Sequence, residues 1–300
     1  PLHIKLAPTV YELSEVEIKP ERERYRRKGN PAVELAQSIV KRRDSLRLDW
    51  HDYYSRDRHE LLTIALNNFD QSKYQAELLD NIGLLQEYLD TSLVSGKPIL
   101  HISARELLAT DYYRKEPERE RQHVKGRKRN GIDDMFSTGE IEALYEETFK
   151  DVDIFQDNIS LFGNKFVSPV SKLGPTFYKY YIMDTIDIGS DRCIDLAFSP
   201  FNVESFGFTG HIYVTTDSTF FIRGVQMNVP HDINMNFVEY MNIKQDYSRQ
   251  PDGTRILNKE TLTAELKVVN ALNGFYAHRE VVYANYSFDS TPQGEKILES

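Results

Sequence analysis

The clearest feature of the sequence is a change in hydrophobic spacing along the chain. From Phe177 onward, apolar side chains recur at every second position, which is the period of a strand with one buried face. Turn-forming clusters at 189–191 (Gly-Ser-Asp) and 251–253 (Pro-Asp-Gly) separate such runs. The pattern predicts an antiparallel meander of about six or seven strands over 177–288. The apolar positions are Tyr180 and Ile182, then Ile194, Leu196 and Phe198, then Ile212 and Val214, then Val225, Met227 and Val229, then Met241 and Ile243, then Leu262, Ala264 and Leu266, and finally Val282, Ala284, Tyr286 and Phe288.

Upstream of the meander, the spacing of apolar residues becomes helical. Asn30-Pro31 places a preferred N-cap residue before a proline at the first helical position, and apolar residues then follow at helical spacing as far as Leu46. We therefore expect an amphipathic helix over 31–47 that packs on the sheet. A second short helix is expected after Ser137, where early acidic residues favour the helix dipole.

The remaining segments complete the expected organisation. Residues 53–66 favour a strand, 72–89 look partly helical, and 97–124 favour two or three strands with polar turns. The fold class predicted is α+β, with a half-barrel-like antiparallel meander sheet packed on the helix at 31–47 and on the second short helix. Residues 1–19 alternate like a strand without partners, so we expect the terminal strand or linker of an upstream β domain, followed by a single domain over 20–300.

Composition and charge narrow the class of protein. Hydrophobic residues make up 40% and charged residues 28%, as in soluble globular domains. The net charge of −9 argues against a nucleic-acid partner, because attraction to phosphates requires a basic footprint. Basic stretches at 19–28 and 105–129 and an acidic stretch at 133–157 are typical of solvated or mutually paired faces.

The search for catalytic and metal-binding residues is mostly negative. Ser38 and Lys41 match S-x-x-K, but the companion motifs of that chemistry are absent. Cys193 follows an arginine, which can activate a thiol, yet its place in a strand favours an inert side chain. His51 and His59 have acidic neighbours, but in an extended strand they lie too far apart to share an ion. We therefore expect no catalytic residues, no metal and no cofactor.

Several ordered blocks of sequence carry a family resemblance. They are YELSEVEIKP, RYRRKGNPAVELAQSIVKRRD, HDYY with LLTIALNN, TDYYRKEPERERQHVKGRKRNGI, SPVSKLGPTFYKYYIMDT and IDLAFSP. From about Tyr11 to about Phe288, this series resembles uncharacterised Bacteroidota proteins that place a carboxypeptidase-regulatory-like domain before a domain of unknown function and an outer-membrane barrel. The resemblance implies export and a periplasmic or outer-membrane-associated location. The helix followed by a meander also resembles the half-barrel of periplasmic lipoprotein carriers, a likeness of fold that implies no function by itself.

Two classes of function follow from these patterns. The first is a non-catalytic binding or adaptor module, whose concave apolar sheet face holds a lipid-like ligand, a lipoprotein or a segment of an envelope or outer-membrane protein. Its plainest form is a passive spacer. The second is an unrecognised hydrolase that uses scattered Asp, Glu and His residues. The binding module is the function predicted, because it uses the strongest patterns in the sequence. The predicted ligand-binding residues share the apolar parity of their strands and are Tyr180, Ile182, Leu196, Phe198, Ile212, Val214 and Leu266.

Overall fold

The computed structural model of the chain describes residues 25–44, 47–70, 86–131, 150–230, 233, 238–267 and 274–300. The predicted terminal strand at 1–19, the second short helix after Ser137 and most of the segment 72–89 lie outside these residues.

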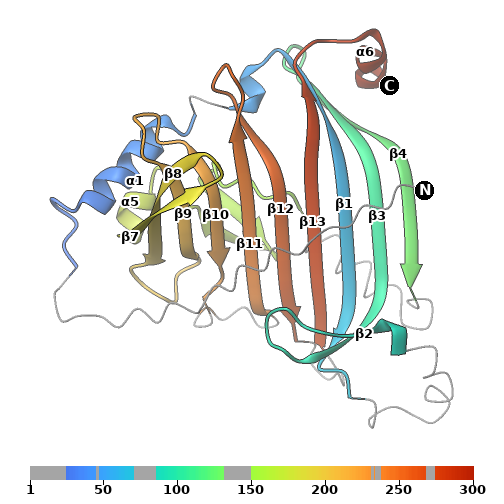
Figure 1. The fold of residues 1–300 in the computed structure, drawn as a ribbon, viewed down its shortest axis with the longest axis horizontal. Coiled ribbons are helices and arrows are strands. Elements are labelled where there is room, and N and C mark those ends of the chain that lie inside the picture. Colours follow the sequence, from blue (N-terminus) through green and yellow to red (C-terminus); the bar gives the residue numbers. More distant parts are fainter. Residues whose placement is uncertain are drawn as a thin grey trace.

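An eleven-stranded antiparallel sheet forms the body of the described molecule (Figure 1). Its spatial order is β2-β3-β1-β13-β12-β11-β10-β9-β8-β7, and β4 also pairs with β3. The strands are β1 (Tyr53–Asn67), β2 (Leu89–Thr91), β3 (Pro98–Arg114), β4 (Arg119–Gly131), β7 (Tyr178–Ile188), β8 (Asp191–Pro200), β9 (Thr209–Thr215), β10 (Ile222–Asn228), β11 (Val238–Arg249), β12 (Arg255–Leu266) and β13 (Gly274–Ser287). The predicted meander is thus confirmed as β7 to β13, and so is the α+β class with an antiparallel sheet.

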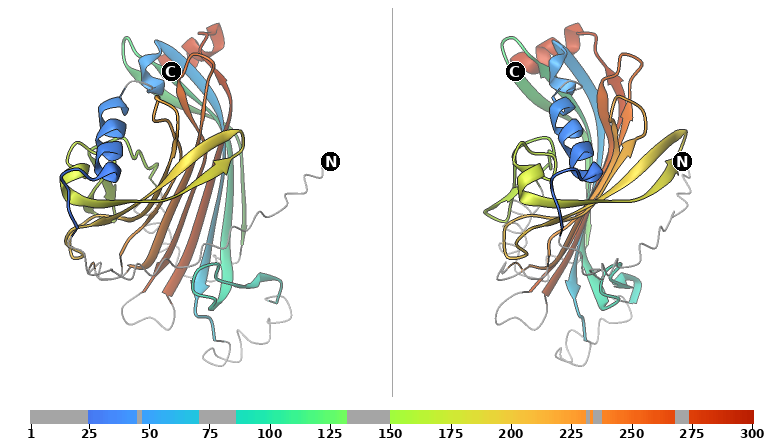
Figure 2. Two further views of the ribbon diagram at one scale, coloured as in Figure 1. Left: turned by 60° about the vertical axis from the view of Figure 1, so that its left-hand side comes forward. Right: turned by 90° about the vertical axis from the view of Figure 1, so that its left-hand side faces the viewer.

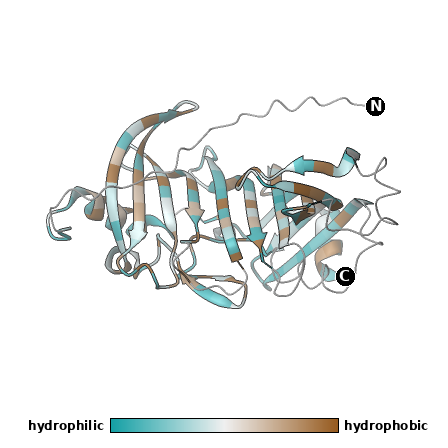
Figure 3. Ribbon diagram, turned by 90° about the horizontal axis from the view of Figure 1, so that it is seen from below, coloured by the Kyte–Doolittle hydropathy of each residue, from teal (hydrophilic) through white to brown (hydrophobic). Residues whose placement is uncertain are grey.

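The N-terminal strands extend this meander. β1 pairs with β13, so that the first long strand lies beside the last one in the sequence. β3 then pairs with β1, and β4 pairs with β3. The segment 97–124, expected to hold two or three strands, contains β3 and part of β4. Along the strands, hydrophobic and hydrophilic positions alternate (Figure 3), which leaves the two faces of the sheet chemically different.

Short helices and one separate hairpin accompany the sheet. The helices are α1 (Pro31–Arg42), α5 (Gly174–Phe177) and α6 (Pro292–Glu299), with 3₁₀ turns η1 (Leu48–Trp50) and η3 (Gln86–Tyr88), and the hairpin consists of β5 (Asn158–Leu161) and β6 (Asn164–Val167). The β5–β6 turn uses Phe162 and Gly163 at positive φ values of 48° and 73°, as a two-residue hairpin turn of this hand requires. The sheet is strongly curved, and α1 lies along its concave side (Figure 2).

Helix α1 begins where the sequence predicts and ends earlier. The Asn30 side-chain oxygen accepts a hydrogen bond from the Ala32 backbone N–H at 2.9 Å, which caps the helix. The helix stops at Arg42 and not at 47. Beyond its end, the Arg43 guanidinium turns inward and donates to Asp157 at 2.7 Å and to the Val170 carbonyl at 3.3 Å. These bonds tie the end of the helix to residues on both sides of the β5–β6 hairpin.

The apolar side chains of α1, of the β5–β6 hairpin and of strands β7 to β12 form one large core. On α1 the buried residues are Ala32, Val33, Leu35, Ala36 and Ile39. On β13, however, the predicted parity is wrong. The inward side chains are Ala277, Arg279, Val281 and Tyr283, whereas Val282 is only half-buried and Ala284 is exposed. Arg279 occupies one of the inward positions of β13 and interrupts the apolar run there. The uninterrupted apolar positions Val282 and Ala284, on which the prediction was based, lie on the outer face.

The pair Leu196 and Ile182 offers a matched test of the core. The two residues are register partners on β8 and β7, but Leu196 is 0% exposed and Ile182 is 46% exposed. We expect Leu196→Asp to destabilise the fold by roughly 4 kcal/mol or more, because the carboxylate would be buried without a partner. Ile182→Asp should change stability by about 1 kcal/mol or less. Urea denaturation followed by circular dichroism measures both, and equal losses would contradict this account of the core.

Candidate functional site

A row of polar side chains crosses the inner face of four neighbouring strands. Glu60 on β1 lies opposite Val281 on β13, Val281 lies opposite Glu260 on β12, and Glu260 lies opposite Gln245 on β11. Arg279 lies two residues before Val281, so its side chain leaves the same face. The sheet register therefore brings together charged groups from sequence positions about 220 residues apart.

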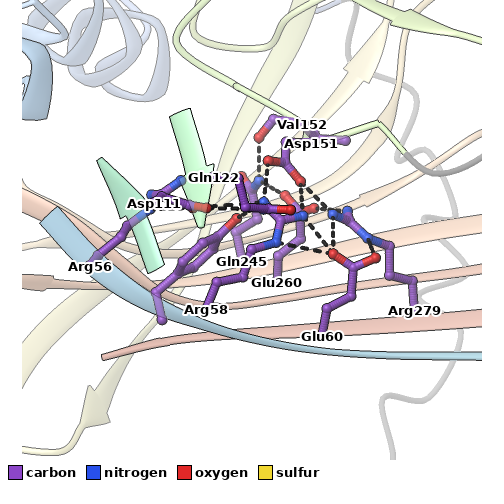
Figure 4. Close-up of polar contacts among 11 residues, drawn as sticks. Arg56, Arg58, Glu60, Asp111, Gln122, Asp151, Val152, Gln245, Glu260 and Arg279 are labelled. Carbon is purple, nitrogen blue, oxygen red and sulfur yellow. Dashed lines mark hydrogen bonds and ion pairs between the residues drawn. The ribbon is translucent and has the colours of Figure 1, made fainter. Parts of the chain in front are cut away.

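Arg279 is the centre of this network (Figure 4). Its side chain is only 1% exposed, although the arginine is among the largest residues in the chain. The Arg279 guanidinium donates to Glu260 at 2.9 Å and to Glu60 at 3.3 Å, and it also bonds Asp151, which belongs to the acidic stretch at 133–157. Three carboxylates from three separate parts of the chain thus share one guanidinium, which is how a buried cation is stabilised.

A second arginine completes the network. Arg58, two residues before Glu60 on β1, donates to both Asp151 oxygens at 2.8 and 2.9 Å and to Glu60 at 2.6 Å. It also donates to the Tyr283 hydroxyl at 3.3 Å. Two donors to each carboxylate fix these side chains in position, because paired Arg–carboxylate bonds constrain orientation as well as distance.

The charges of the network do not balance. Glu60, Asp151 and Glu260 surround only Arg58 and Arg279, so full ionisation would leave one excess negative charge. Burial, together with repulsion from Asp151, raises the pKa of Glu260 to about 7 even though Arg279 opposes the shift. Although loss of solvent acts against ionisation, bonds from the two arginines lower the pKa values of Glu60 and Asp151. Glu260 is thus the carboxyl that can hold a proton near neutral pH.

Gln245 and Tyr247 extend the network on β11. The Gln245 amide donates to the Val152 carbonyl at 2.6 Å and also bonds Glu260. The Tyr247 hydroxyl donates to the Gln245 side-chain oxygen at 2.8 Å. These bonds attach the segment around Val152 to the sheet, beside Asp151.

A cavity of about 270 Å³ lies beside the network. Its wall combines strands β1, β11, β12 and β13 with residues 47–49 and 151–155. Four aromatic rings line it, those of Tyr54, Phe155, Tyr247 and Tyr283. Three guanidinium groups, those of Arg47, Arg56 and Arg255, line it as well. Four carboxylates, those of Asp49, Asp151, Asp153 and Glu260, complete the charged part of the wall, so the cavity offers aromatic surface together with charges of both signs.

The three arginines differ in their partners. Arg47 donates from Nε to Asp49 at 2.8 Å, and Arg56 donates from Nε to Asp111 at 3.1 Å. Arg255 donates to the backbone oxygen of Arg43 at 3.2 Å, and its guanidinium carbon lies 3.2 Å from the centre of the Phe155 ring. Burial lowers the pKa of Arg255 to about 10, so the side chain stays charged at neutral pH.

The seven ligand-binding residues predicted from the sequence lie elsewhere. Six of them are buried in the main core: Tyr180, Leu196, Phe198, Ile212, Val214 and Leu266. Ile182 is exposed on β7. The Tyr180 hydroxyl donates to the Pro169 carbonyl at 2.5 Å, so its polar end is satisfied within the core. The structure brings the six together as packed side chains, none of the seven lines the cavity, and their role in ligand binding stays a prediction.

The residues considered for catalysis or metal binding occupy ordinary environments. The Ser38 hydroxyl donates to the Glu34 carbonyl at 2.9 Å within α1. Burial raises the pKa of the Cys193 thiol, so a smaller fraction of it is ionised to the reactive thiolate at neutral pH. His51 lies 2.8 Å from the Thr254 hydroxyl, and His59 lies 2.8 Å from a Glu106 oxygen. Within the described ranges, no three His, Cys, Asp or Glu side chains gather in a metal-binding arrangement.

Comparison with known proteins gives one family and several distant folds. The model of the family of unknown function DUF5686 matches residues 66–286. A putative outer membrane lipoprotein-sorting protein domain from Vibrio parahaemolyticus shares 11% identity, with 89% of this chain and 100% of that chain covered at a TM-score of 0.32. A DUF1329 family protein from Desulfovibrio piger shares 12% identity, with 86% and 93% covered at a TM-score of 0.32. A LolA superfamily protein from Nitrosomonas europaea shares 9% identity, with 88% and 96% covered at a TM-score of 0.29. No curated protein matches the chain.

Among the helices of the described residues, none has both the length and the apolar character needed to cross a membrane.

Removal of Arg279 should break the network. Arg279→Met would leave Glu60, Asp151 and Glu260 with a single guanidinium, so we expect a loss of about 3–5 kcal/mol in unfolding free energy. Lys259→Met is the control, because Lys259 pairs with Glu280 at 2.8 Å on a part-exposed site. The control should lose about 1 kcal/mol or less. Urea denaturation of both variants measures the difference, and similar losses would show that the network contributes little.

The raised pKa of Glu260 predicts a pH dependence of stability. Its folded pKa of about 7 exceeds the ordinary value of 4.5, so the folded state binds the extra proton between these values. Stability should therefore fall as pH rises from about 5 to about 8, by on the order of 1–3 kcal/mol from this group. Glu260→Gln cannot ionise, so its unfolding free energy should change less between the two pH values. Denaturation of both proteins at each pH measures this, and parallel pH profiles would exclude Glu260 as the titrating group.

Proposed function

We propose that this chain, which belongs to the family of unknown function DUF5686, is a non-catalytic module that binds a small ligand in the cavity beside the Arg279 network. The observation that carries the proposal is the cavity itself. It has a volume of about 270 Å³, and aromatic rings and charged groups converge on it. A concave site with a few fixed polar groups among apolar ones is the usual form of a ligand pocket.

The network supports this proposal by fixing the cavity wall. Asp151 and Glu260 line the cavity and are held by the guanidinium groups of Arg58 and Arg279. Side chains held in this way are already ordered before a ligand binds, which lowers the entropic cost of binding. Binding in a preformed pocket is therefore what the arrangement favours.

The composition of the wall favours binding over catalysis. Its residues are Arg, Asp, Glu, Tyr, Phe, Leu and Val, a set without a serine, cysteine, histidine or lysine. Such a set lacks the usual nucleophiles and the usual general base of acyl-transfer enzymes. The carboxylates Asp49, Asp151 and Glu260 each bond an arginine, so they are occupied within the protein.

The cavity also suggests what kind of ligand fits. A lipid chain on the apolar sheet face would have to displace packed residues such as Leu196 and Phe198. The cavity is smaller than the usual pockets for drug-sized molecules, which begin at about 300 Å³. A compact molecule or the head group of a lipid or lipoprotein is the ligand proposed. The ordered sequence blocks support an exported, periplasmic or outer-membrane-associated location for such a module.

A cavity-filling variant tests the proposal. Leu257 lines the cavity and is half-buried, so Leu257→Trp should occupy the space with its indole ring. Val203→Trp is the control, because Val203 is 50% exposed and outside the cavity wall. Ligand-observed NMR with a set of small acids, amines and neutral aromatic compounds should detect binding to the natural protein and to the control. Leu257→Trp should lose that binding. Absence of binding by every compound, or equal binding to Leu257→Trp, would overturn the proposal.

A further inference from the structure

Arg255 differs from every other arginine of the cavity wall. Only 9% of this residue is exposed, and among the described residues no carboxylate lies at ion-pair distance from its guanidinium. Arg47 and Arg56, the other two, each bond an aspartate. A charge taken out of water without a bonded counter-ion costs free energy, which ring stacking, one carbonyl contact and the more distant Asp153 and Asp44 offset only in part.

Arg249 makes the contrast sharper. It lies directly opposite Arg255 in the register of β11 and β12, and its guanidinium also lies over an aromatic ring, that of Phe221. Arg249, however, bonds the Asp217 carboxylate at 3.3 Å. Two arginines at matched positions of one hairpin thus share the aromatic contact, and only Arg249 has a carboxylate partner.

None of the carboxylates around the cavity bonds Arg255, although Asp153 favours its charge from a longer distance. Asp49 bonds Arg47, while Asp151 and Glu260 bond the arginines of the network. Asp153 is the remaining acidic residue of the wall, and its two oxygens accept from the Phe155 backbone N–H at 2.9 Å and from the Gln156 amide at 3.0 Å. Arg255 is therefore the cation of the wall that has no carboxylate of its own.

We propose that the ligand of the cavity carries a carboxylate or phosphate group that pairs with the guanidinium of Arg255 above the Phe155 ring. This inference rests on the proposed function and adds the chemical class of the ligand. A planar guanidinium binds oxyanions through two parallel hydrogen bonds, and the pairing is strong where water is excluded. The ligand supplies the directly bonded counter-ion that the protein does not.

The rest of the wall indicates the remainder of the ligand. Tyr54, Tyr247 and Tyr283 line the cavity. The hydroxyl of Tyr247 bonds Gln245, and that of Tyr283 accepts from Arg58, so these two hydroxyls are already used within the protein. Their rings offer apolar surface, which favours an aromatic or apolar body attached to the anionic group.

Three phenyl probes of similar size test the charge requirement on the natural protein. Benzoate, benzamide and benzylamine present an anion, a neutral amide and a cation on the same ring. Isothermal titration calorimetry at pH 7 should find benzoate tighter than benzamide by about tenfold or more, with no binding of benzylamine. Equal affinity for benzoate and benzamide, or preference for benzylamine, would overturn the inference. In both of those outcomes the cavity still binds small molecules, so the proposed function would stand.

Variants assign the effect to Arg255. Arg255→Gln should weaken benzoate binding about tenfold or more and leave benzamide binding nearly unchanged. Arg249→Gln, the matched control, should bind benzoate like the natural protein. Arg255→Lys keeps the charge without the planar fork and should show intermediate affinity. Because Arg255→Gln removes a buried group, circular dichroism first establishes its folding. If it does not fold, Arg255→Lys and the three probes decide the question.

Two further probes distinguish the sources of the anion. Phenyl phosphate represents a free phosphorylated compound, and vesicles of phosphatidylglycerol in phosphatidylcholine represent a lipid head group. Arg255-dependent binding of phenyl phosphate alone indicates a soluble ligand, and Arg255-dependent co-sedimentation with the vesicles indicates a lipid. If benzoate, phenyl phosphate and the vesicles all bind Arg255→Gln as well as they bind the natural protein, the inference fails.

Discussion

The burial of Arg279 is the constraint on which the rest of the site depends. A guanidinium that is 1% exposed must be surrounded by acceptors, and three carboxylates from β1, β12 and residue 151 provide them. Because β13 carries the arginine, the network joins the first long strand of the chain to the last two. It also holds the segment that begins at Asp151 against the sheet. The position of the cavity wall thus follows from the charge balance around one side chain.

The concave face of the sheet is divided by this network into two regions of different chemistry. Toward β7, the face is apolar and is covered by α1 and by the β5–β6 hairpin, whose Phe166 is fully buried. Toward β1 and β13, the inward positions hold Arg58, Glu60 and Arg279. Apolar packing stabilises the first region. Hydrogen-bonded ion pairs hold the second, beside a smaller apolar cluster that includes Leu62, Ile64 and Ala277. The cavity lies at the charged region, where directional hydrogen bonds fix the orientation of the side chains as well as their distances.

Much of the fold could be predicted from the sequence because its rules are local. Period-two spacing located the strands of the meander, and Asn30-Pro31 located the start of α1. The charged site was missed for a related reason. Arg58 and Glu60 stand at inward positions of β1, and Arg279 stands at an inward position of β13. A search that takes apolar residues as the mark of the inward face assigns such charged positions to the outer face. Charges of both signs at one parity on several strands were the available signal. The pairing of β1 with β13, which makes those charges neighbours, depends on contacts across more than two hundred residues and is not encoded in any local pattern.

The place of Arg255 could not be predicted from sequence for a different reason, because the property that distinguishes it is the absence of a nearby carboxylate. Arg249 and Arg255 flank the same turn and carry the same side chain, and a sequence pattern treats them alike. Asp217, from the loop between β9 and β10, pairs with one of them, whereas the acids nearest to the other are already bonded elsewhere. A fold that balances its buried charges around Arg279 with three carboxylates could have supplied one more for Arg255. A buried cation without such a partner lowers stability, and proteins keep costs of this kind most readily at sites of function. The same physical rule that explains the network therefore makes Arg255 the group around which binding is best sought.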